Sequence, residues 1–258
     1  MDGHDTMGKT AIDSLVALGQ MRVWSLIITI FGDAVLPRGG TAPSTALAEL
    51  TGAIGVKPEA FRVALSRLTR DGWIERSRTG RHSFYRLSQK GLDTFAPASA
   101  RIYAAAPGEV SRWQLVARPG GDGPDGFAEV APRLWLGPVG ALVPGDALAV
   151  EGSLADPPDW ARAALTDVDT VAGYAALADV LDSVLDEVAR TKLDPLTAAA
   201  IRTLVIHQWR RLVLRHGDWP AGVFPEGWQG EVCRDRVHAI LATLPQASNW
   251  FDTAFAKG

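Results

Sequence analysis

The hydrophobic pattern between Ser44 and Gly72 predicts two helices in succession. The first is expected over about residues 44–54. The second should begin at Pro58, because proline suits the first helical position, and it should end at Gly72. Within the second helix, four apolar residues recur at helical spacing and form one stripe that must face a core: Phe61, Ala64, Leu65 and Leu68.

The segment after Gly72 predicts a β-hairpin. Trp73 and Ile74 are followed by a basic run, a Thr79-Gly80 turn and a period-two pattern from Phe84 to Leu87. Gly80 supplies the positive φ that a tight reversal requires. Two helices followed by a hairpin are the element order of a winged helix-turn-helix, which holds one helix in the major groove of DNA.

Basic side chains line the polar face of the second helix and the tip of the hairpin. Arginine is well suited to a bidentate contact with guanine, and it also neutralises phosphates. We therefore expect contacts with double-stranded DNA from Lys57, Arg62, Ser66, Arg67, Arg70, Arg76, Arg78, Arg81 and His82. A helix with one charged face is also typical of a solvated surface, so the pattern alone leaves both interpretations open.

The charge of the chain is distributed unevenly. Residues 57–90 contain nine Lys or Arg and three acidic residues, a balance of +6, whereas the whole chain has a net charge of −3. Residues 1–100 carry +3 and residues 101–258 carry −6. A basic segment is therefore attached to an acidic body, and this local positive charge is what a DNA-binding surface requires.

The rest of the chain predicts further helices and a small group of strands. Helices are expected over residues 13–31, from Ser88 to about Tyr103 with a kink or division at Pro97, and over 173–190, 194–216 and 230–244. Strands are expected over residues 113–118, 133–136 and 147–151. We predict an α+β, multidomain chain with a winged helix in residues 1–95, a linker helix and small central α+β domain in 96–172, and a helical domain in 173–258.

Composition indicates a globular protein that acts in the cytoplasm. With 47% hydrophobic and 21% charged residues, the 258-residue chain can bury sizeable cores. The N-terminus lacks the pattern of a signal peptide, and the apolar stretch 23–31 is too short to span a membrane. Cys233 is the single cysteine, which excludes an internal disulfide and suits a reducing compartment.

Candidate catalytic and metal-binding groups are sparse. The thiol and imidazoles of Cys233, His207, His216 and His238 could ligate zinc, but their spacing matches no compact ligand set. Asp122 and Asp125 could serve a nuclease, although they lie in a Gly/Pro-rich loop typical of solvated acids. We expect no enzyme, metal or cofactor. A metal-dependent nuclease or hydrolase with a winged-helix interaction module is the alternative.

Aromatic and cationic residues in the second half of the chain are candidates for a small-molecule site. Aromatic walls together with cations suit an aryl acid or an acyl-CoA thioester. The candidates are Trp113, Trp135, His207, Trp209, Arg210 and Arg211. Core packing explains the tryptophans equally well, because tryptophan is buried on average.

Several segments together resemble the PaaX family of bacterial transcriptional repressors. They are Ser25–Asp33, Phe61–Leu68, Asp71–Ile74, Tyr85–Leu87, Arg101–Tyr103, Trp135, His207–Arg211, and Leu214-Arg215 through Trp219-Pro220 to Trp228. The resemblance spans most of the chain. It implies an N-terminal winged helix, a central Cas2-like ferredoxin-type domain and a helical C-terminal domain.

The resemblance also implies a ligand-responsive repressor that binds an inverted-repeat operator as a homodimer and is released by an aryl-acetyl-CoA thioester. One departure concerns the central domain. The loop from Pro119 to Gly126 is too short for the crossover helix of a ferredoxin-like unit, so we expect that domain to be abbreviated. A regulator that has no ligand is the milder alternative.

Overall fold

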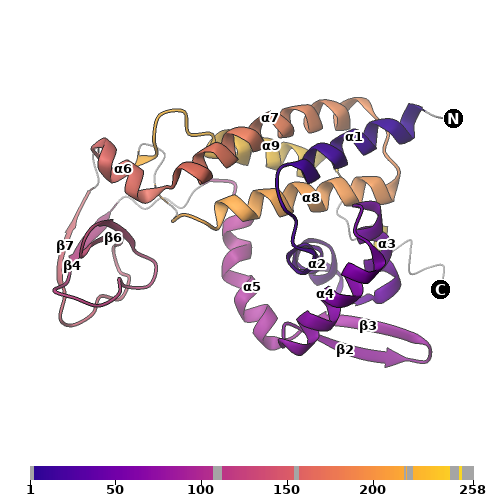
Figure 1. Ribbon diagram of the computed structural model, residues 1–258, viewed down its shortest axis with the longest axis horizontal. Helices are drawn as coiled ribbons and strands as arrows, with labels where there is room; N and C mark the ends of the chain where they lie inside the picture. Colours follow the sequence, from indigo (N-terminus) through magenta and orange to yellow (C-terminus); the bar gives the residue numbers. More distant parts are fainter. Residues whose placement is uncertain are drawn as a thin grey trace.

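The computed structural model describes residues 3–106, 112–153, 157–217, 219, 223–244 and 250–251. They form a helical body with a hairpin along one edge and a small sheet at one end (Figure 1). The helices and helical turns are α1 (Gly3–Ala17), α2 (Val23–Ile30), η1 (Phe31–Val35), η2 (Leu36–Arg38), α3 (Ser44–Ala53), α4 (Pro58–Arg70), α5 (Gln89–Ile102), α6 (Asp159–Leu165), α7 (Val168–Arg190), α8 (Pro195–Val213) and α9 (Gly230–Thr243). The strands are β1 (Thr41–Pro43), β2 (Ile74–Thr79), β3 (His82–Leu87), β4 (Trp113–Ala117), β5 (Ala128–Ala131), β6 (Leu134–Pro138) and β7 (Leu148–Gly152).

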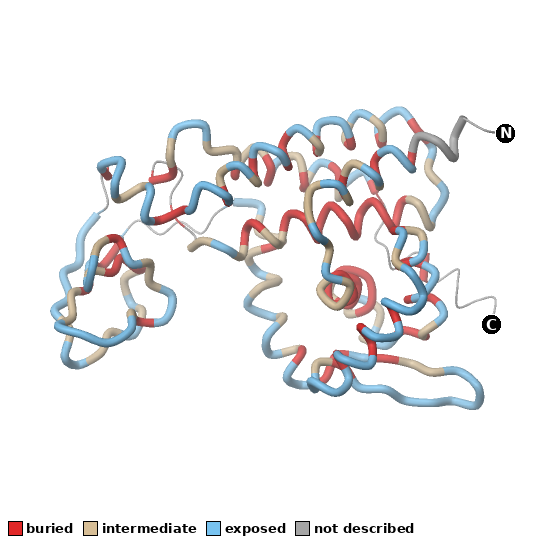
Figure 2. Tube along the Cα trace, in the orientation of Figure 1, coloured by how far each residue is buried: buried red, intermediate tan, exposed pale blue. Residues whose placement is uncertain are grey.

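Helix α8 is the centre of the body. It begins with Pro195 at its first position and Asp194 as the cap, whose carboxylate accepts from the N–H groups of Leu196 and Thr197. Helix α8 is buried along nearly its whole length, including the polar side chains of Arg202, His207 and Gln208, as expected for the central helix of a body (Figure 2). Helices α1, α2, α3, α5, α7 and α9 all contact it.

One continuous hydrophobic core joins the two ends of the chain. Leu47, Phe61 and Ile74, from the segment that contains α3, α4 and the hairpin, belong to the same buried cluster as Leu181 and Val237 from α7 and α9. The position of the hairpin is therefore fixed to the C-terminal helices through α2 and α8. The three-domain division with boundaries near residues 95 and 172 stays a prediction.

The N-terminal helical region differs from the single helix expected over residues 13–31. The chain forms α1 and α2 separately, with a connection over residues 18–22, and α2 continues into the π-helical turn η1. Gly19 lies in that connection with φ +152°. Glycine is unfavourable in the interior of a helix, which explains why the chain forms two helices here and not one. Of the two outcomes expected at Pro97, a kink or a division, the division does not occur, because α5 continues through Pro97 as one helix.

The small sheet has the order β5-β6-β4-β7, with every neighbouring pair antiparallel. The central domain is abbreviated, as expected: a ferredoxin-like unit carries helices between its strands, whereas the described residues 118–127 and 139–147 contain none. The sheet has its own core, in which Leu165 of α6 and Trp219 pack against Trp113 and Val130.

The helices were also compared with the length and hydropathy that a membrane-spanning helix needs. No helix among the described residues is both long enough and apolar enough to cross a bilayer.

Candidate nucleic-acid interface

Helix α4 has the two faces expected from its sequence. All four residues of the apolar stripe are buried, none of them more than 6% exposed. On the opposite face Val63 is 68% exposed, although its side chain is apolar. A valine held in solvent between arginines can meet the methyl group of a thymine. The turn before α4 is closed by Gly55, at φ +91°, and by a hydrogen bond from the Val56 N–H to the Thr51 carbonyl at 3.0 Å.

Every residue expected to contact DNA is exposed. Lys57 precedes α4, is exposed and makes no capping hydrogen bond with its side chain. Arg62 lies 3.7 Å from Glu59 in the preceding turn. The structure thus gathers the following residues on α4 and the adjacent hairpin: Lys57, Arg62, Ser66, Arg67, Arg70, Arg76, Arg78, Arg81 and His82.

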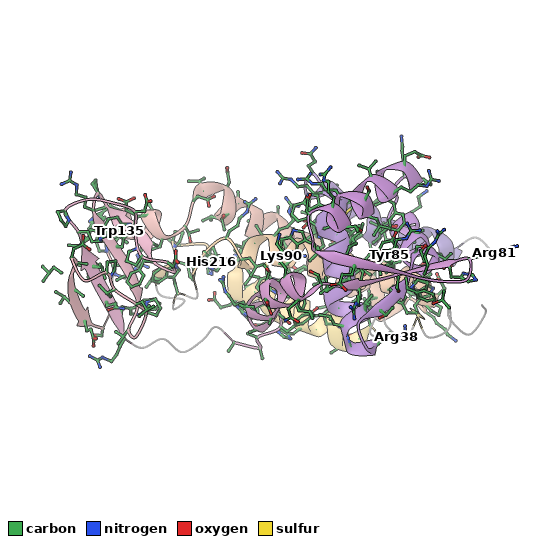
Figure 3. The ribbon with its side chains drawn as sticks, turned by 90° about the horizontal axis from the view of Figure 1, so that it is seen from below. Arg38, Arg81, Tyr85, Lys90, Trp135 and His216 are labelled. Atoms are coloured by element: carbon green, nitrogen blue, oxygen red, sulfur yellow. The ribbon has the colours of Figure 1, made fainter. Side chains whose placement is uncertain are left out.

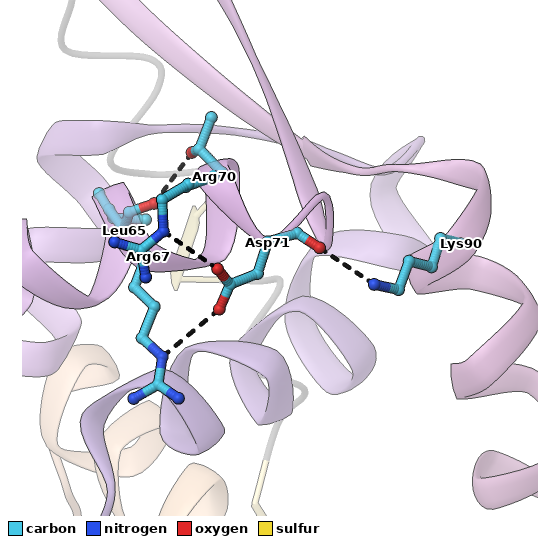
Figure 4. A network of polar contacts seen from close by, with 6 residues as sticks. Leu65, Arg67, Arg70, Asp71 and Lys90 are labelled. Atoms are coloured by element: carbon cyan, nitrogen blue, oxygen red, sulfur yellow. Dashed lines mark hydrogen bonds and ion pairs between the residues drawn. The ribbon is translucent and has the colours of Figure 1, made fainter.

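Asp71 organises the C-terminal end of α4 (Figure 4). Its carboxylate accepts from Nε of Arg67 at 3.4 Å and from Nε of Arg70 at 3.2 Å. Its backbone carbonyl accepts from Nζ of Lys90 at 3.0 Å. One acidic residue therefore holds two arginines of the exposed face and one lysine of the following helix.

The hairpin places its arginines on a defined face. Arg76 is paired with Tyr85 and Arg78 with Ser83 across the two strands. Because strand side chains alternate, Arg76 and Arg78 share a face with Ile74, whose side chain lies in the core beside α4. The Arg76 guanidinium donates to Oγ of Ser83 at 2.7 Å, while Arg81 lies at the tip (Figure 3).

Lys90 was missed by sequence reasoning as an interface residue, although it was counted in the basic segment. It lies beside the candidate interface because the start of α5 is hydrogen-bonded to the turn that follows α4. The Ser88 hydroxyl donates to the Gly72 carbonyl at 2.6 Å, and the Ser88 N–H donates to the Trp73 carbonyl at 3.0 Å. Lys90 then lies over the ring of Trp73, 5.6 Å from its centroid. Periodicity within either helix gives no signal of this contact.

The six candidates for a small-molecule site fall into two groups. Trp113 and Trp135 lie in the small sheet, where Trp113 stacks on Trp219 with ring centroids 4.5 Å apart. His207, Trp209, Arg210 and Arg211 lie on α8. Trp209 borders a cavity of about 20 Å³, and Arg211 borders another of about 150 Å³. Neither cavity contains Trp113 or Trp135.

Three of the α8 candidates are occupied by internal contacts. The indole N–H of Trp209 donates to the Ile102 carbonyl at 2.9 Å. Nδ1 of His207 lies 3.1 Å from Oγ1 of Thr29, to which Arg210 also donates at 2.9 Å. Burial, reinforced by the charges of Arg210 and Arg211, lowers the pKa of His207 to about 3. His207 is therefore neutral at physiological pH.

The candidate zinc ligands also have other partners. Sγ of Cys233 donates to the Tyr174 carbonyl at 3.3 Å, and burial raises the pKa of this thiol to about 12. Nε2 of His238 lies 3.0 Å from the Ala104 carbonyl, and Nε2 of His216 lies 2.8 Å from the Tyr174 hydroxyl. Within the described ranges, no three His, Cys, Asp or Glu side chains gather closely enough to hold a metal ion.

Comparisons with known proteins match both ends of the chain. The family model described as PaaX-like protein matches residues 22–91, and the model described as PaaX-like protein C-terminal domain matches residues 166–254. The small sheet lies between the two matched regions. An uncharacterized protein from Mycobacterium tuberculosis has a solved structure that aligns with a TM-score of 0.45 and 18% identity, over 83% of this chain and 92% of that chain.

A curated relative aligns over nearly the whole length. The transcriptional repressor PaaX of Escherichia coli (strain K12) is 30% identical over 284 residues, which cover 96% of this chain and 87% of the relative. The matched segments include α4, the hairpin and the central helix α8. The chain belongs to the PaaX family.

Proposed function

We propose that this protein is a DNA-binding transcriptional regulator, and specifically a repressor. The observation that carries the proposal is the exposed arginine face of α4 beside a basic hairpin, on a chain whose relative is a named transcriptional repressor. In this proposal α3, α4 and the β2–β3 hairpin act as a winged helix-turn-helix. Helix α4 enters the major groove and the hairpin reaches the flanking backbone.

The proposal assigns different roles to the helix and the hairpin. Arg62, Ser66, Arg67 and Arg70 contact base edges or straddle the groove, because they line the exposed face of α4. Lys57 neutralises a phosphate at the start of that helix. Arg76, Arg78, Arg81 and His82 hold the flanking backbone, where contacts set affinity and orientation rather than sequence preference.

The assembly in the proposal is a homodimer in the cytoplasm on an inverted-repeat operator. Two DNA-binding modules related by a two-fold axis contact half-sites about 10 to 10.5 bp apart, or a multiple of that distance. Selection of bound sequences from a random duplex pool tests this point directly. A recovered motif without two-fold symmetry contradicts the dimeric arrangement.

The release signal in the proposal is a small acidic ligand, such as an aryl acid or an acyl-CoA thioester. A ligand that binds only the native state raises the melting temperature, so a thermal-shift screen of these compounds tests it. A screen without any shift favours a regulator that has no ligand.

The decisive experiment for the proposed function replaces Arg62, Arg67 and Arg70 together by alanine. Each lost arginine contact to a base or phosphate costs about 1–3 kcal/mol, so the triple variant should lose duplex binding at concentrations where the parent is saturated. A matched control replaces three arginines of the body by alanine, namely Arg112, Arg190 and Arg236. If the α4 variant shifts DNA as well as this control does, the assignment is wrong.

The same assay separates the repressor from the nuclease alternative. Parent protein and duplex are incubated with and without Mg²⁺ or Mn²⁺. The repressor leaves an intact complex under both conditions, whereas strand cleavage that requires the metal supports an enzyme.

A further inference from the structure

Three arginines from distant parts of the chain converge beside the C-terminal end of α8. Arg211 and Arg215 lie one helical turn apart, with Arg215 just after the helix. Arg22 ends the connection between α1 and α2 and is close enough for its charge to act on Arg211. The Arg211 guanidinium lies against the backbone of Gly19 in that connection. A Cβ atom at Gly19 would be only 3.1 Å from its Nη2.

The positive charge of this cluster, Arg22, Arg211 and Arg215, is unbalanced. None of the three forms an ion pair with any described residue. Arg211 donates instead to the neutral side-chain carbonyl of Gln208 at 2.7 Å. Burial lowers the pKa of Arg211, and the charges of Arg215 and Arg22 lower it further. The three cations therefore raise one another's free energy in the absence of an anion.

A cavity of about 150 Å³ adjoins the cluster. Arg211, Arg215 and the amide of Gln208 form its polar side, and Leu18 and Leu212 are among its apolar residues. The lining also contains Asp169, which lies in the first turn of α7. Its negative charge is stabilised there by the positive end of the helix dipole. Asp167, the cap of α7, also lies near Arg215. Two carboxylates against three guanidinium groups still leave a net positive site.

We propose that Arg22, Arg211 and Arg215 bind a small soluble oxyanion that carries two or more negative charges, such as a phosphorylated or polycarboxylate metabolite. Guanidinium groups match the oxygens of phosphate and carboxylate in bidentate geometry. The cavity accommodates the anion and a few apolar atoms of the same molecule. This site shares Arg211 with the ligand candidates and so deepens the ligand part of the proposed function, but it is separate from the arginine face of α4 and its titration does not require DNA binding.

The location of the site gives it a structural consequence. The connection that carries Gly19 and Arg22 leads directly into α2, which packs against both α4 and α8. An anion held between Arg22 and the end of α8 ties this connection to the central helix. Occupancy of the site therefore stabilises the arrangement of α2 on α8 against which α4 is positioned.

The test measures anion binding in the absence of DNA. Sodium pyrophosphate and sodium citrate are titrated into the full chain by calorimetry and thermal shift, with sodium chloride at matched ionic strength as the reference. We expect a saturable signal and a rise of the melting temperature by about 2–4 °C for at least one of the two anions. The two anions distinguish phosphate from carboxylate chemistry.

Variants at exposed positions locate the site without disturbing the fold. Arg215→Gln and Arg22→Gln should each weaken the affinity by about tenfold or more, because a charge-assisted contact is lost. Arg190→Gln, on the exposed surface of α7, is the matched control and should bind as the parent does. Absence of saturable binding to the parent overturns the proposal, and so does unchanged affinity in both cluster variants.

A negative result in the anion titration and a negative result in the DNA-binding experiment can be told apart. Loss of anion binding leaves the duplex assay of the α4 variants unaffected, and loss of duplex binding leaves the pyrophosphate titration interpretable.

Discussion

The guanidinium of Arg202 donates two hydrogen bonds to the carboxylate of Asp33, which lies 169 positions earlier in the chain, at 2.8 and 2.9 Å. Both side chains are buried. Arg202 also donates to the carbonyls of Leu241 and Leu244, and the Tyr103 hydroxyl donates to Asp33 at 3.2 Å. Burial raises the pKa of Tyr103 above its usual value, so this hydroxyl keeps its proton. The pair connects η1, α5, α8 and the end of α9.

Removal of one partner from this pair should destabilise the protein strongly. Arg202→Met leaves the Asp33 carboxylate buried without its cation, which costs about 3–5 kcal/mol. Urea unfolding followed by circular dichroism measures the change. The double variant Asp33→Asn, Arg202→Met should recover part of the loss. As a control, Arg190→Ala removes the exposed ion pair with Asp186 and should cost about 1 kcal/mol or less. An Arg202 variant as stable as this control contradicts the prediction.

Asp71→Asn should raise affinity for random-sequence DNA by roughly two- to fivefold and lower sequence preference. The substitution removes a negative charge close to the duplex in the proposed complex, and it also frees Arg67 and Arg70 from the carboxylate that orients them. Competition binding with specific and random duplexes measures both quantities. Asp186→Asn, which frees Arg190 on the far surface of α7, should change neither. Equal effects of the two substitutions would exclude an orienting role for Asp71.

Arg67→Ala and Arg78→Ala should change DNA binding in different ways. The helix variant should lose about 1–3 kcal/mol on the preferred sequence and relax preference at one position, if Arg67 contacts a base. The hairpin variant should weaken binding to all sequences, and the slope of log affinity against log salt concentration should fall in magnitude by about one. Titrations at several salt concentrations on two duplexes distinguish the patterns. Identical behaviour of the two variants contradicts the division of roles.

The free energy of unfolding should decrease as the pH falls below 6.5, because His207 binds a proton more readily in the unfolded chain than in the folded protein. Its pKa is about 3 in the folded state and about 6.5 in the unfolded chain, so between these values the unfolded state binds more protons. The stabilising contribution is complete above pH 6.5 and is lost progressively toward pH 3. From pH 7 to pH 5 the expected loss is about 2 kcal/mol.

Urea unfolding of the parent and of His207→Gln at both pH values isolates this contribution from those of other titrating groups. Glutamine cannot be protonated, so the variant should lose less stability than the parent over the same interval. Parallel pH profiles for the two proteins would count against a buried neutral His207.

Local sequence features predicted the elements of the candidate interface correctly. Proline at position 58, the stripe that begins with Phe61 and the Thr79-Gly80 turn led to α4 and the hairpin within two residues of their observed bounds. The caps Ser88 and Asp194 likewise marked the starts of α5 and α8. Each of these signals is complete within about one turn of helix or one hairpin, so no distant residue is needed to interpret it.

Prediction failed where the deciding contacts are distant in sequence. The expected continuous helix over residues 13–31 is divided at Gly19, a local signal that the prediction did not use, and the resulting connection lies beside Arg211 of α8. Strand β5, with the weakly strand-forming sequence Ala-Glu-Val-Ala, was not predicted and is formed by pairing with β6 and contact with α6. The aromatic candidates were grouped by residue type, whereas the fold separates Trp113 and Trp135 from His207 and Trp209.

The sequence by itself determined the two-faced helix α4, the basic hairpin after it and the positive charge of residues 57–90, because periodicity, turn residues and charge are local properties. Only the tertiary structure decided that Asp33 meets Arg202, that Lys90 joins the end of α4 and that Arg22 lies beside the end of α8. A hydrophobic pattern states which face of a helix must be buried but not which surface covers it. That choice depends on packing and charge pairing between segments more than a hundred residues apart.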